Sequence, residues 1–355
     1  MISDPTTDVA DIALSFETRL MEVLSQRRER SRAFAAPYTQ LWESLERMAA
    51  GGKRIRPKLL IDTHEALGGI HARAAVDAAC AMELLHIALV IHDDVIDKDL
   101  MRRGEINLSG RFASEAMLRG KTRPVASSWG EASALLAGDL MLTLAHSLLA
   151  RLDVPEERRQ SILDVFDDTV FESAAGEHYD VWLSMHLEQA SPEDVLAMVD
   201  QKTAAYSFEA PLVLAAVLAG ATKGMIEELM VIARQIGVIY QLRDDVLGLF
   251  GDEKETGKSA LGDLREGKET LLIAYARSDP SWTEVEPLFG NSALSVADAH
   301  RLRRVIEESG ARVFVESLIA ERCENVYDLI RGAQLPLVLR KQLTDLTSAC
   351  NSRTS

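Results

Sequence analysis

The feature that most constrains this chain is the spacing of its apolar residues, which recur every three or four positions along one segment after another. This is the period of a helix with one buried face, and the same segments are rich in Ala, Leu, Met and Glu, which favour helices. The segments predicted to be helical are residues 9–26, 73–97, 131–152, 160–183, 192–218 and 223–248. Alternating β-branched runs joined by Asn-Gly or Asp-Gly turns are nearly absent, so the sequence predicts an all-α fold. No change of composition divides the chain, and a single domain over residues 10–350 is the simplest organisation.

Composition argues against several classes of protein. Hydrophobic residues make up 47% of the 355 residues, which is enough for a large buried core. The formal net charge of −16 argues against a nucleic-acid partner, because such proteins usually carry a basic surface. The cysteines at positions 80, 323 and 350 are far apart and odd in number, so they predict neither a disulfide framework nor a zinc site.

Three further features predict a cytoplasmic protein. The cysteine pattern suits a reducing compartment. The first ten residues contain acids and no basic leader before an apolar run, so a secretory signal is not expected. The longest apolar stretches, such as residues 210–221, are too short to span a bilayer, so the sequence predicts no transmembrane segment.

Two stretches between the predicted helices differ from ordinary connections. Residues 49–57 combine a glycine pair with Lys53, Arg54 and Arg56 immediately before a helix. Residues 104–128 are long, mixed in charge and interrupted by glycine and proline, and we expect a mobile loop or lid there.

An acidic cluster ends the apolar helix expected over residues 73–97. Asp93 and Asp97 are four residues apart and share one helix face, with Asp94 on its flank. Three neighbouring carboxylates repel one another unless water or cations solvate them, and hard divalent cations suit oxygen ligands and substrate phosphates. A solvated acidic helix end is the alternative interpretation.

A second cluster, Asp244 and Asp245, ends another apolar helix about 150 residues further along the chain. Two such helix ends could face each other and hold magnesium ions, which would make a bridged diphosphate a good leaving group. Two unrelated polar helix ends are the alternative. The apolar residues before Asp93 would then line a slot for a hydrocarbon tail, although each is individually more typical of a plain core. They include Leu85, Ala88 and Leu89.

The ordered motifs resemble those of the trans-isoprenyl diphosphate synthases, the polyprenyl synthetase family, over nearly the whole chain. The motifs are residues 51–57 (GGKRIRP), 83–86 (ELLH), 93–97 (DDVID), 101–104 (MRRG), 138–139 (GD), 202–203 (KT), 241–245 (QLRDD), 257–258 (GK) and 266–270 (EGKET). The sequence around Gly248 and Asp263 is most similar to that of bacterial, actinobacterial-type geranylgeranyl diphosphate synthases. This resemblance implies a helical bundle with a central active-site cavity, assembled as a homodimer.

The resemblance implies a head-to-tail condensation of isopentenyl diphosphate with an allylic diphosphate (dimethylallyl, geranyl or farnesyl), giving all-trans geranylgeranyl diphosphate. Asp93 and Asp97, supported by Asp94, would bind Mg²⁺ on the allylic diphosphate, and Asp244 and Asp245 would hold a further ion. Three Mg²⁺ ions are implied when diphosphate is bound.

The remaining implied roles belong to cations and to two polar residues. The implied ligands of isopentenyl diphosphate are Lys53, Arg56, His86 and Arg103. The implied contacts of the allylic diphosphate are Arg102, Lys202, Lys258 and Lys268. Thr203 and Gln241 match positions near the reacting carbons, and with Lys202 they form the implied catalytic group. Taken alone, Lys53 and Arg56 would equally suit a solvated basic loop, and Arg102 and Arg103 a helix C-terminus. His86 would better suit a satisfied core histidine. Surface positions would better suit Lys202, Thr203, Lys258 and Lys268.

The chain departs from the family pattern at two positions. Gly248 replaces a third aspartate of the second cluster, for which Asp252 is a doubtful substitute, and Glu177 stands where glutamine is usual. In related enzymes a bulky aromatic residue near position 88 keeps products short, so Ala88 favours a twenty-carbon product. The alternatives are a longer-chain or farnesyl synthase, a terpene cyclase, and a non-catalytic synthase subunit. An aromatic content of only 5% disfavours the cyclase.

Overall fold

The computed structural model describes residues 5–102, 104–251, 260–291 and 293–353. Helices dominate these residues, which confirms the predicted all-α fold, and one short hairpin joins β1 (Met101–Arg102) to β2 (Glu105–Ile106). The helices form two units. Unit 1 comprises Met1–Phe166 and Pro211–Ala221, and unit 2 comprises Asp167–Ala210 and Thr222–Ser355. A single domain over residues 10–350 therefore stays a prediction.

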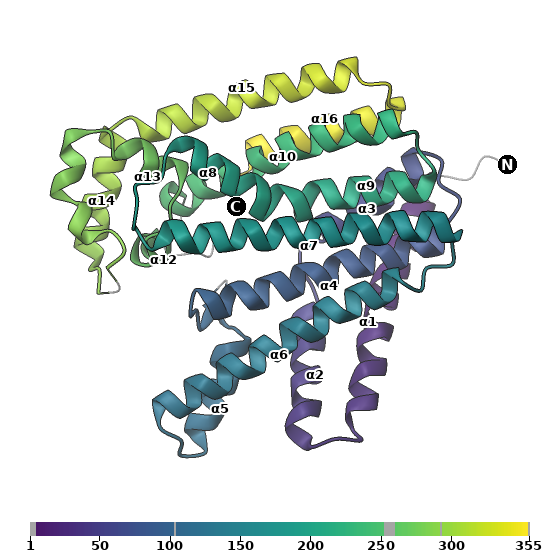
Figure 1. Cartoon of the computed structure of the whole chain (residues 1–355), viewed down its shortest axis with the longest axis horizontal. Coiled ribbons are helices and arrows are strands. Elements are labelled where there is room, and N and C mark those ends of the chain that lie inside the picture. Colours follow the sequence, from purple (N-terminus) through teal and green to yellow (C-terminus); the bar gives the residue numbers. More distant parts are fainter. Residues whose placement is uncertain (1–4, 103, 252–259, 292, 354–355) are drawn as a thin grey trace. The chain divides into compact units, whose positions relative to one another are not determined.

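Unit 1 is built around helix α4, which packs against α1, α3 and α6 (Figure 1). Its helices are α1 (Pro5–Ser31), α2 (Ala36–Ala49), α3 (Ile55–Ala66), α4 (Ala72–Ile96), α5 (Leu108–Leu118) and α6 (Arg123–Leu149), with most of α9 (Ala210–Ala219). A methyl group at Gly138 of α6 would lie 2.2 Å from Nε2 of His92. Glycine therefore lets α6 approach the acidic end of α4.

The expected loop at residues 104–128 is wrong as secondary structure. Helix α5 and the start of α6 occupy most of it, and the two helices pack against each other. Asn107 caps α5 by accepting a hydrogen bond from the Gly110 backbone amide, and Phe112 is buried. Two of the residues that suggested a loop lie at helix ends instead. Gly120 follows α5 with positive φ, and Pro124 lies in the first turn of α6. Whether this segment moves stays a prediction.

Unit 2 is built around helix α10, which packs against η1, α15 and α16. The regular elements of unit 2 are α8 (Pro192–Val199), η1 (Asp200–Glu209), α10 (Lys223–Phe250), α12 (Ala260–Glu266), α13 (Leu271–Ala276), η2 (Pro280–Glu284), η3 (Glu286–Leu288), α14 (Val296–Glu308), α15 (Ala311–Gly332) and α16 (Leu337–Ser352). Helix α7 (Glu156–Ser184) runs from unit 1 into unit 2.

The helix predicted over residues 192–218 is present but interrupted in its backbone geometry. Ser191 caps α8 by accepting from the Asp194 amide, and Pro192 opens the helix. The following ten residues form the π-helix η1 before α9 resumes α-helical geometry. A π-helix is rare and often marks a functional position, and no local sequence signal predicts it.

Among the described residues, three helices are long and apolar enough to cross a membrane by length and composition alone: Ala72–Ile96, Arg123–Leu149 and Pro192–Ala219. The predicted absence of a transmembrane segment is therefore not confirmed. The prediction relied on uninterrupted apolar runs, whereas these helices also contain polar residues, among them Glu83 of α4 and Asp139 of α6. Most of the apolar stretch is buried inside the protein in the first and third helices, and less than half of it in the second.

Candidate active site

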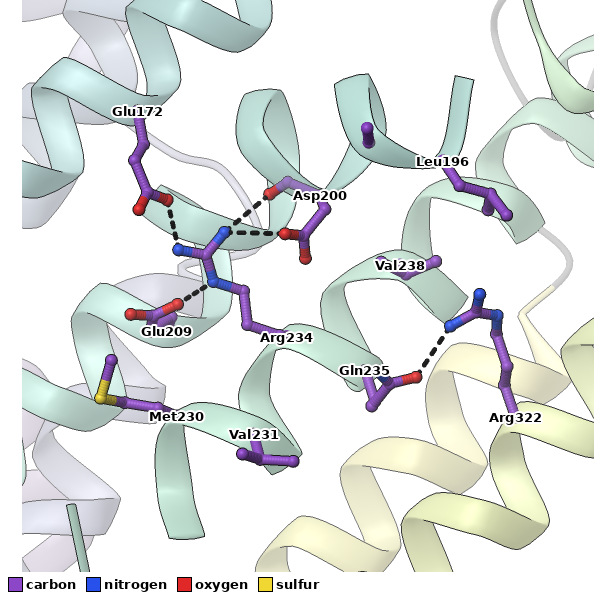
Figure 2. A pocket seen from close by; sticks show the side chains of 11 residues that line it. Glu172, Leu196, Asp200, Glu209, Met230, Val231, Arg234, Gln235, Val238 and Arg322 are labelled. Atoms are coloured by element: carbon purple, nitrogen blue, oxygen red, sulfur yellow. Dashed lines mark hydrogen bonds and ion pairs between the residues drawn. The ribbon is translucent and has the colours of Figure 1, made fainter. Parts of the chain in front are cut away.

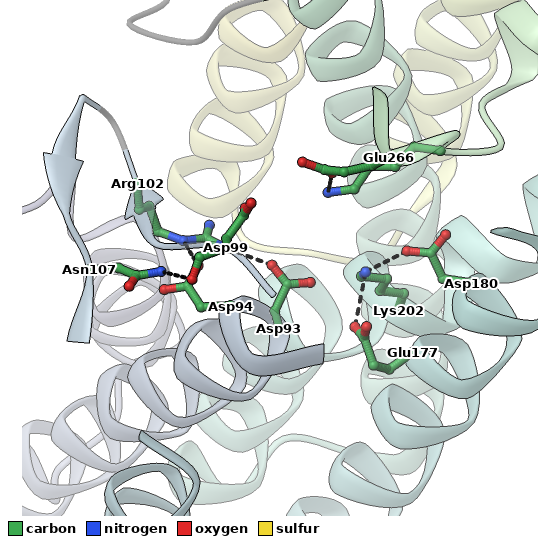
Figure 3. Close-up of polar contacts among 10 residues, drawn as sticks. Asp93, Asp94, Asp99, Arg102, Asn107, Glu177, Asp180, Lys202 and Glu266 are labelled. Carbon is green, nitrogen blue, oxygen red and sulfur yellow. Dashed lines mark hydrogen bonds and ion pairs between the residues drawn. The ribbon is translucent and has the colours of Figure 1, made fainter. Parts of the chain in front are cut away.

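The predicted site residues fall into two groups, one in each unit. In unit 1, the last turn of α4 presents Asp93 and Asp94 to Arg102 of β1 (Figure 3). Arg102 donates from Nε to Asp94 Oδ1 and from Nη2 to Asp93 Oδ2, both at 2.6 Å. The structure thus brings two predicted metal ligands together with a predicted diphosphate ligand.

Burial shapes the electrostatics of this group. Desolvation raises the pKa of the buried Asp94 carboxyl, while Arg102 and then Asn107 act in the opposite direction. Desolvation alone would lower the pKa of Arg102, but the charges of Asp94 and Asp93 outweigh it and raise that pKa. Arg102 is therefore firmly cationic and offsets the repulsion between neighbouring carboxylates.

The glycine-containing loop before α3 is held by a residue to which the sequence assigned no role. Arg54 has left-handed backbone geometry (φ 50°) and donates to Glu17, Glu83 and the Ala49 carbonyl oxygen. Glu83 is a buried acid within an apolar helix, so it needs a cationic partner. This need is the feature of the sequence that could have pointed to Arg54. Arg54 lies between Lys53 and Arg56, and it fixes the backbone that carries both side chains.

The residues predicted to face a hydrocarbon tail lie on α4. Leu85 and Ala88 are fully buried, and Leu89 and His86 are partly exposed. This burial suits both a core and the wall of a slot, so the chain-length assignment stays a prediction.

In unit 2, α10 and η1 form a hydrogen-bonded relay. Thr203 Oγ1 donates to Gln241 Oε1 at 3.0 Å, and Gln241 Nε2 donates to Asp245 Oδ1 at 2.8 Å. Asp244 pairs with Arg353 near the C-terminus, whose guanidinium lies 4.6 Å from the centre of the Tyr240 ring. The predicted catalytic pair Thr203 and Gln241 is therefore in direct contact.

Lys202 lies between two carboxylates of α7 (Figure 3). Its Nζ is 2.6 Å from Asp180 Oδ2 and 2.9 Å from Glu177 Oε2. The departure from the family pattern at Glu177 therefore has a structural consequence, because it adds a second negative charge beside a predicted diphosphate ligand.

The structure describes some of the remaining predicted residues and leaves others outside the described ranges. Lys268 contacts Glu266 at 3.1 Å. A methyl group at Gly248 would lie 2.9 Å from Asp263 Oδ2, so an acidic side chain of α12 already approaches the position of the missing aspartate. Arg103, Lys258 and Asp252 lie outside the described residues.

The carboxylates of the candidate site suit a magnesium ion that is also bound by substrate phosphates. Within the described residues, no three His, Cys, Asp or Glu side chains are arranged to hold a metal by themselves. Mg²⁺ at phosphate-processing sites is typically held by one or two carboxylates together with substrate phosphates, and it needs no complete protein cage. The carboxylates at the ends of α4 and α10 match that requirement.

Comparison with known proteins agrees with this geometry. The sequence profile of the polyprenyl synthetase family matches residues 39–306. A geranylfarnesyl diphosphate synthase of Aeropyrum pernix is 33% identical over 85% of this chain and 90% of its own length. A geranylgeranyl diphosphate synthase of Methanosarcina mazei is 32% identical over 76% of each chain. The crystal structure of geranylgeranyl pyrophosphate synthase from Corynebacterium glutamicum, complexed with isoprenyl diphosphate and magnesium, superposes with a TM-score of 0.86 and 28% identity. That alignment covers 95% of this chain and 98% of the other.

The profile match covers about three quarters of the chain and includes both aspartate clusters and the Lys202-Thr203 pair. The relatives align over most of their own lengths, and the fold agrees throughout. The chain therefore belongs to the polyprenyl synthetase family and is a prenyltransferase.

Proposed function

We propose that the enzyme condenses isopentenyl diphosphate head to tail with an allylic diphosphate, in a reaction that requires Mg²⁺. The observation that carries this proposal is the acidic end of α4, where Asp93 and Asp94 are paired with Arg102. Carboxylates for the metal and a guanidinium for phosphate oxygens are the two kinds of ligand that a diphosphate leaving group needs.

Each group has a distinct role in the proposed reaction. Bound Mg²⁺ would neutralise the charge that develops on the departing diphosphate. Its proposed ligands in unit 1 are Asp93, Asp94 and Asp97, and Asp244 and Asp245 of unit 2 are the proposed ligands of a further ion. Three ions are proposed when diphosphate is bound. The proposed cationic ligands of the allylic diphosphate are Arg102, Lys202, Lys258 and Lys268.

The hydrogen-bonded residues Thr203, Gln241 and Asp245 of unit 2 would act at the reacting carbon atom of the allylic substrate. Breaking the allylic carbon–oxygen bond leaves a delocalised cation, and the double bond of isopentenyl diphosphate then attacks it to form the new carbon–carbon bond. Because Gln241 is oriented by Asp245, its carbonyl oxygen accepts from Thr203 and leaves lone pairs of the Thr203 hydroxyl for the cation. The proton lost afterwards goes to the departed diphosphate.

The basic loop before α3 would bind the second substrate. Lys53, Arg56 and His86, with Arg103, are the proposed ligands of isopentenyl diphosphate. Arg54 contributes indirectly, because its bonds to Glu17 and Glu83 fix this loop.

The proposed product is all-trans geranylgeranyl diphosphate. Ala88 lies five residues before Asp93 on α4. Its small side chain would leave room for a tail longer than fifteen carbons, which supports this product. The names of the relatives span more than one product length, so a longer-chain or farnesyl synthase is the alternative that product analysis separates.

We also propose a cytoplasmic homodimer. The three cysteines are free and buried, which suits a reducing compartment. Helix α6 exposes apolar side chains that a second copy of the chain would cover. These side chains are Val125, Trp129, Leu135 and Leu136. Light scattering of the purified protein should give twice the monomer mass, and a monomer at micromolar concentration would contradict the proposal.

The decisive test of the reaction is turnover of labelled isopentenyl diphosphate with and without Mg²⁺. Asp93→Ala and Asp244→Ala should each lower kcat by about 100-fold or more while the protein stays folded. Asp345→Ala is the matched control, since Asp345 is an exposed carboxylate of α16 paired only with the neighbouring Lys341 in the contacts observed. Near-normal turnover in either cluster variant would contradict the metal assignment. Hydrocarbon release without consumption of isopentenyl diphosphate would indicate a cyclase, and no turnover by the wild-type chain would indicate a non-catalytic subunit.

A further inference from the structure

Arg234 of α10 contacts both ends of the π-helix η1 (Figure 2). At the first residue of η1, Arg234 Nη1 donates to Asp200 Oδ2 at 3.0 Å and to the Asp200 carbonyl oxygen at 3.4 Å. At the last residue, Arg234 Nε donates to Glu209, and Nη2 donates to Glu172 of α7. One guanidinium therefore joins three structural elements, α7, α10 and η1.

The π-helix needs such support. Its i→i+5 hydrogen bonds and wide turns are less favourable than α-helical geometry, so surrounding contacts must select it. Two glycines bring the neighbouring helices unusually close to its centre. A methyl group at Gly176 of α7 would lie 2.2 Å from the Lys202 amide nitrogen, and one at Gly237 of α10 would lie 2.5 Å from Ala204 Cβ. Packing thus holds the middle of η1, and Arg234 holds its ends.

Charge makes Arg234 difficult to replace. Burial raises the pKa of the Asp200 and Glu209 carboxyls, and Arg234 acts against that shift at both. Together with Glu172, three carboxylates surround this one guanidinium, so its removal leaves mutual repulsion at both ends of η1. The ends would separate or the carboxyls would take up protons, and either change alters the winding between them.

Lys202 and Thr203 are the third and fourth residues of η1, so the backbone geometry of this π-helix sets the directions of their side chains. A π-helical turn contains more residues than an α-helical turn, so the directions of the Lys202 and Thr203 side chains depend on this geometry. Relaxation to α-helical winding would rotate both side chains away from Asp180 and Gln241, which they now contact.

We propose that Arg234 is a positioning residue, which holds Lys202 and Thr203 in their reactive directions by fixing both ends of the π-helix. This inference rests on the proposed roles of those two residues in the condensation. Arg234 itself is not assigned a contact with substrate.

The matched comparison is Arg234→Met against Arg322→Met. Both arginines line the same pocket, but Arg322 of α15 donates its hydrogen bond to Gln235 of α10 at 2.8 Å and influences η1 through its charge, which acts on Asp200. Hydrogen exchange should be about 10-fold or more faster in peptides covering residues 200–209 of Arg234→Met, and much less affected there in Arg322→Met, which removes a charge near Asp200 and a hydrogen bond to α10. Arg234→Lys should give an intermediate result, because an ammonium cannot reproduce the fork of donors. Exchange that is equal in Arg234→Met and wild type would overturn the proposal.

Kinetics separates positioning from general stability. Arg234→Met should lower kcat about 10-fold or more and leave KM for isopentenyl diphosphate nearly unchanged. In a Thr203→Ala background, Arg234→Met should cost less than in the wild type, because one of the two groups that Arg234 positions is already absent. Losses that are fully additive in both the Thr203→Ala and the Lys202→Met backgrounds would overturn the proposal, since they would show that Arg234 acts independently of both residues.

Two further variants keep the outcomes distinct. If Arg234→Met does not fold, Glu209→Gln removes one carboxylate charge while keeping an acceptor, and faster exchange confined to residues 200–209 is then expected; unchanged exchange there would count against the proposal. Full activity of both Thr203→Ala and Lys202→Met would refute their proposed catalytic roles. The exchange measurements would still decide whether Arg234 fixes η1.

Discussion

Arg54→Met should be among the most damaging single substitutions in unit 1. The Arg54 side chain is 13% exposed and donates to Glu83, whose side chain is 8% exposed, and to Glu17, which is 46% exposed. Methionine has a similar length and also a β-carbon, so the left-handed backbone at position 54 costs about the same in both proteins. The substitution therefore tests the charge and the hydrogen bonds.

The two acidic partners contribute unequally. Removing the partner of a buried charge costs about 3–5 kcal/mol, because the remaining carboxylate loses compensation without regaining water. The more exposed pair with Glu17 is worth about 0.2–1 kcal/mol, since solvent screens it. The Glu83 pair decides the result, and we expect Arg54→Met to lower the free energy of unfolding by about 3–5 kcal/mol.

Urea unfolding at a fixed protein concentration measures this change from the transition midpoint and slope. Glu17→Gln is the matched control and should cost about 1 kcal/mol or less. Glu83→Gln added to Arg54→Met should restore much of the loss, because it removes the uncompensated charge. A loss below about 1 kcal/mol in Arg54→Met, or an equal loss in Glu17→Gln, would refute the reasoning. Since Lys53 and Arg56 flank Arg54, KM for isopentenyl diphosphate should also rise more than kcat falls.

Two further predictions concern Ala88 and Gly248. Ala88→Phe should shift dephosphorylated products, separated by chromatography, toward fifteen carbons or fewer. An unchanged product with a destabilisation of about 1–3 kcal/mol would instead indicate an overpacked core. Gly248→Asp should raise the Mg²⁺ concentration needed for half-maximal activity, because the new carboxylate meets Asp263 Oδ2, which lies 2.9 Å from an added Cβ. Gly248→Asn has nearly the same shape without the charge, and an identical Mg²⁺ dependence in both variants would contradict the electrostatic argument.

The sequence by itself determined the helical class and the family. Helical periodicity, the Ser191 cap and the acidic ends of α4 and α10 depend on contacts within a few residues, which a sequence displays directly. The ordered motifs identified the polyprenyl synthetase family, which the profile match confirms.

Local signals were misleading where tertiary packing overrides them. The glycines and prolines of residues 104–128 predicted a loop, yet most of them lie at helix ends, and packing against α6 stabilises α5 between them. The π-helix η1 likewise has no sequence signature. The close approach of Gly176 and Gly237 and the bonds of Arg234 are the contacts that favour it over α-helical winding.

Only the tertiary structure decided which charges meet. Arg54 is separated from Glu83 by 29 residues, and Arg234 from Glu172 by 62, so no sequence spacing connects them. The sequence marked Lys202 and Thr203 as candidate catalytic residues but not the contacts that orient them, which are Glu177, Asp180 and Gln241. The physical reason is that helix formation is governed by neighbours along the chain, whereas the partner of a side chain depends on which helices pack together and in what register.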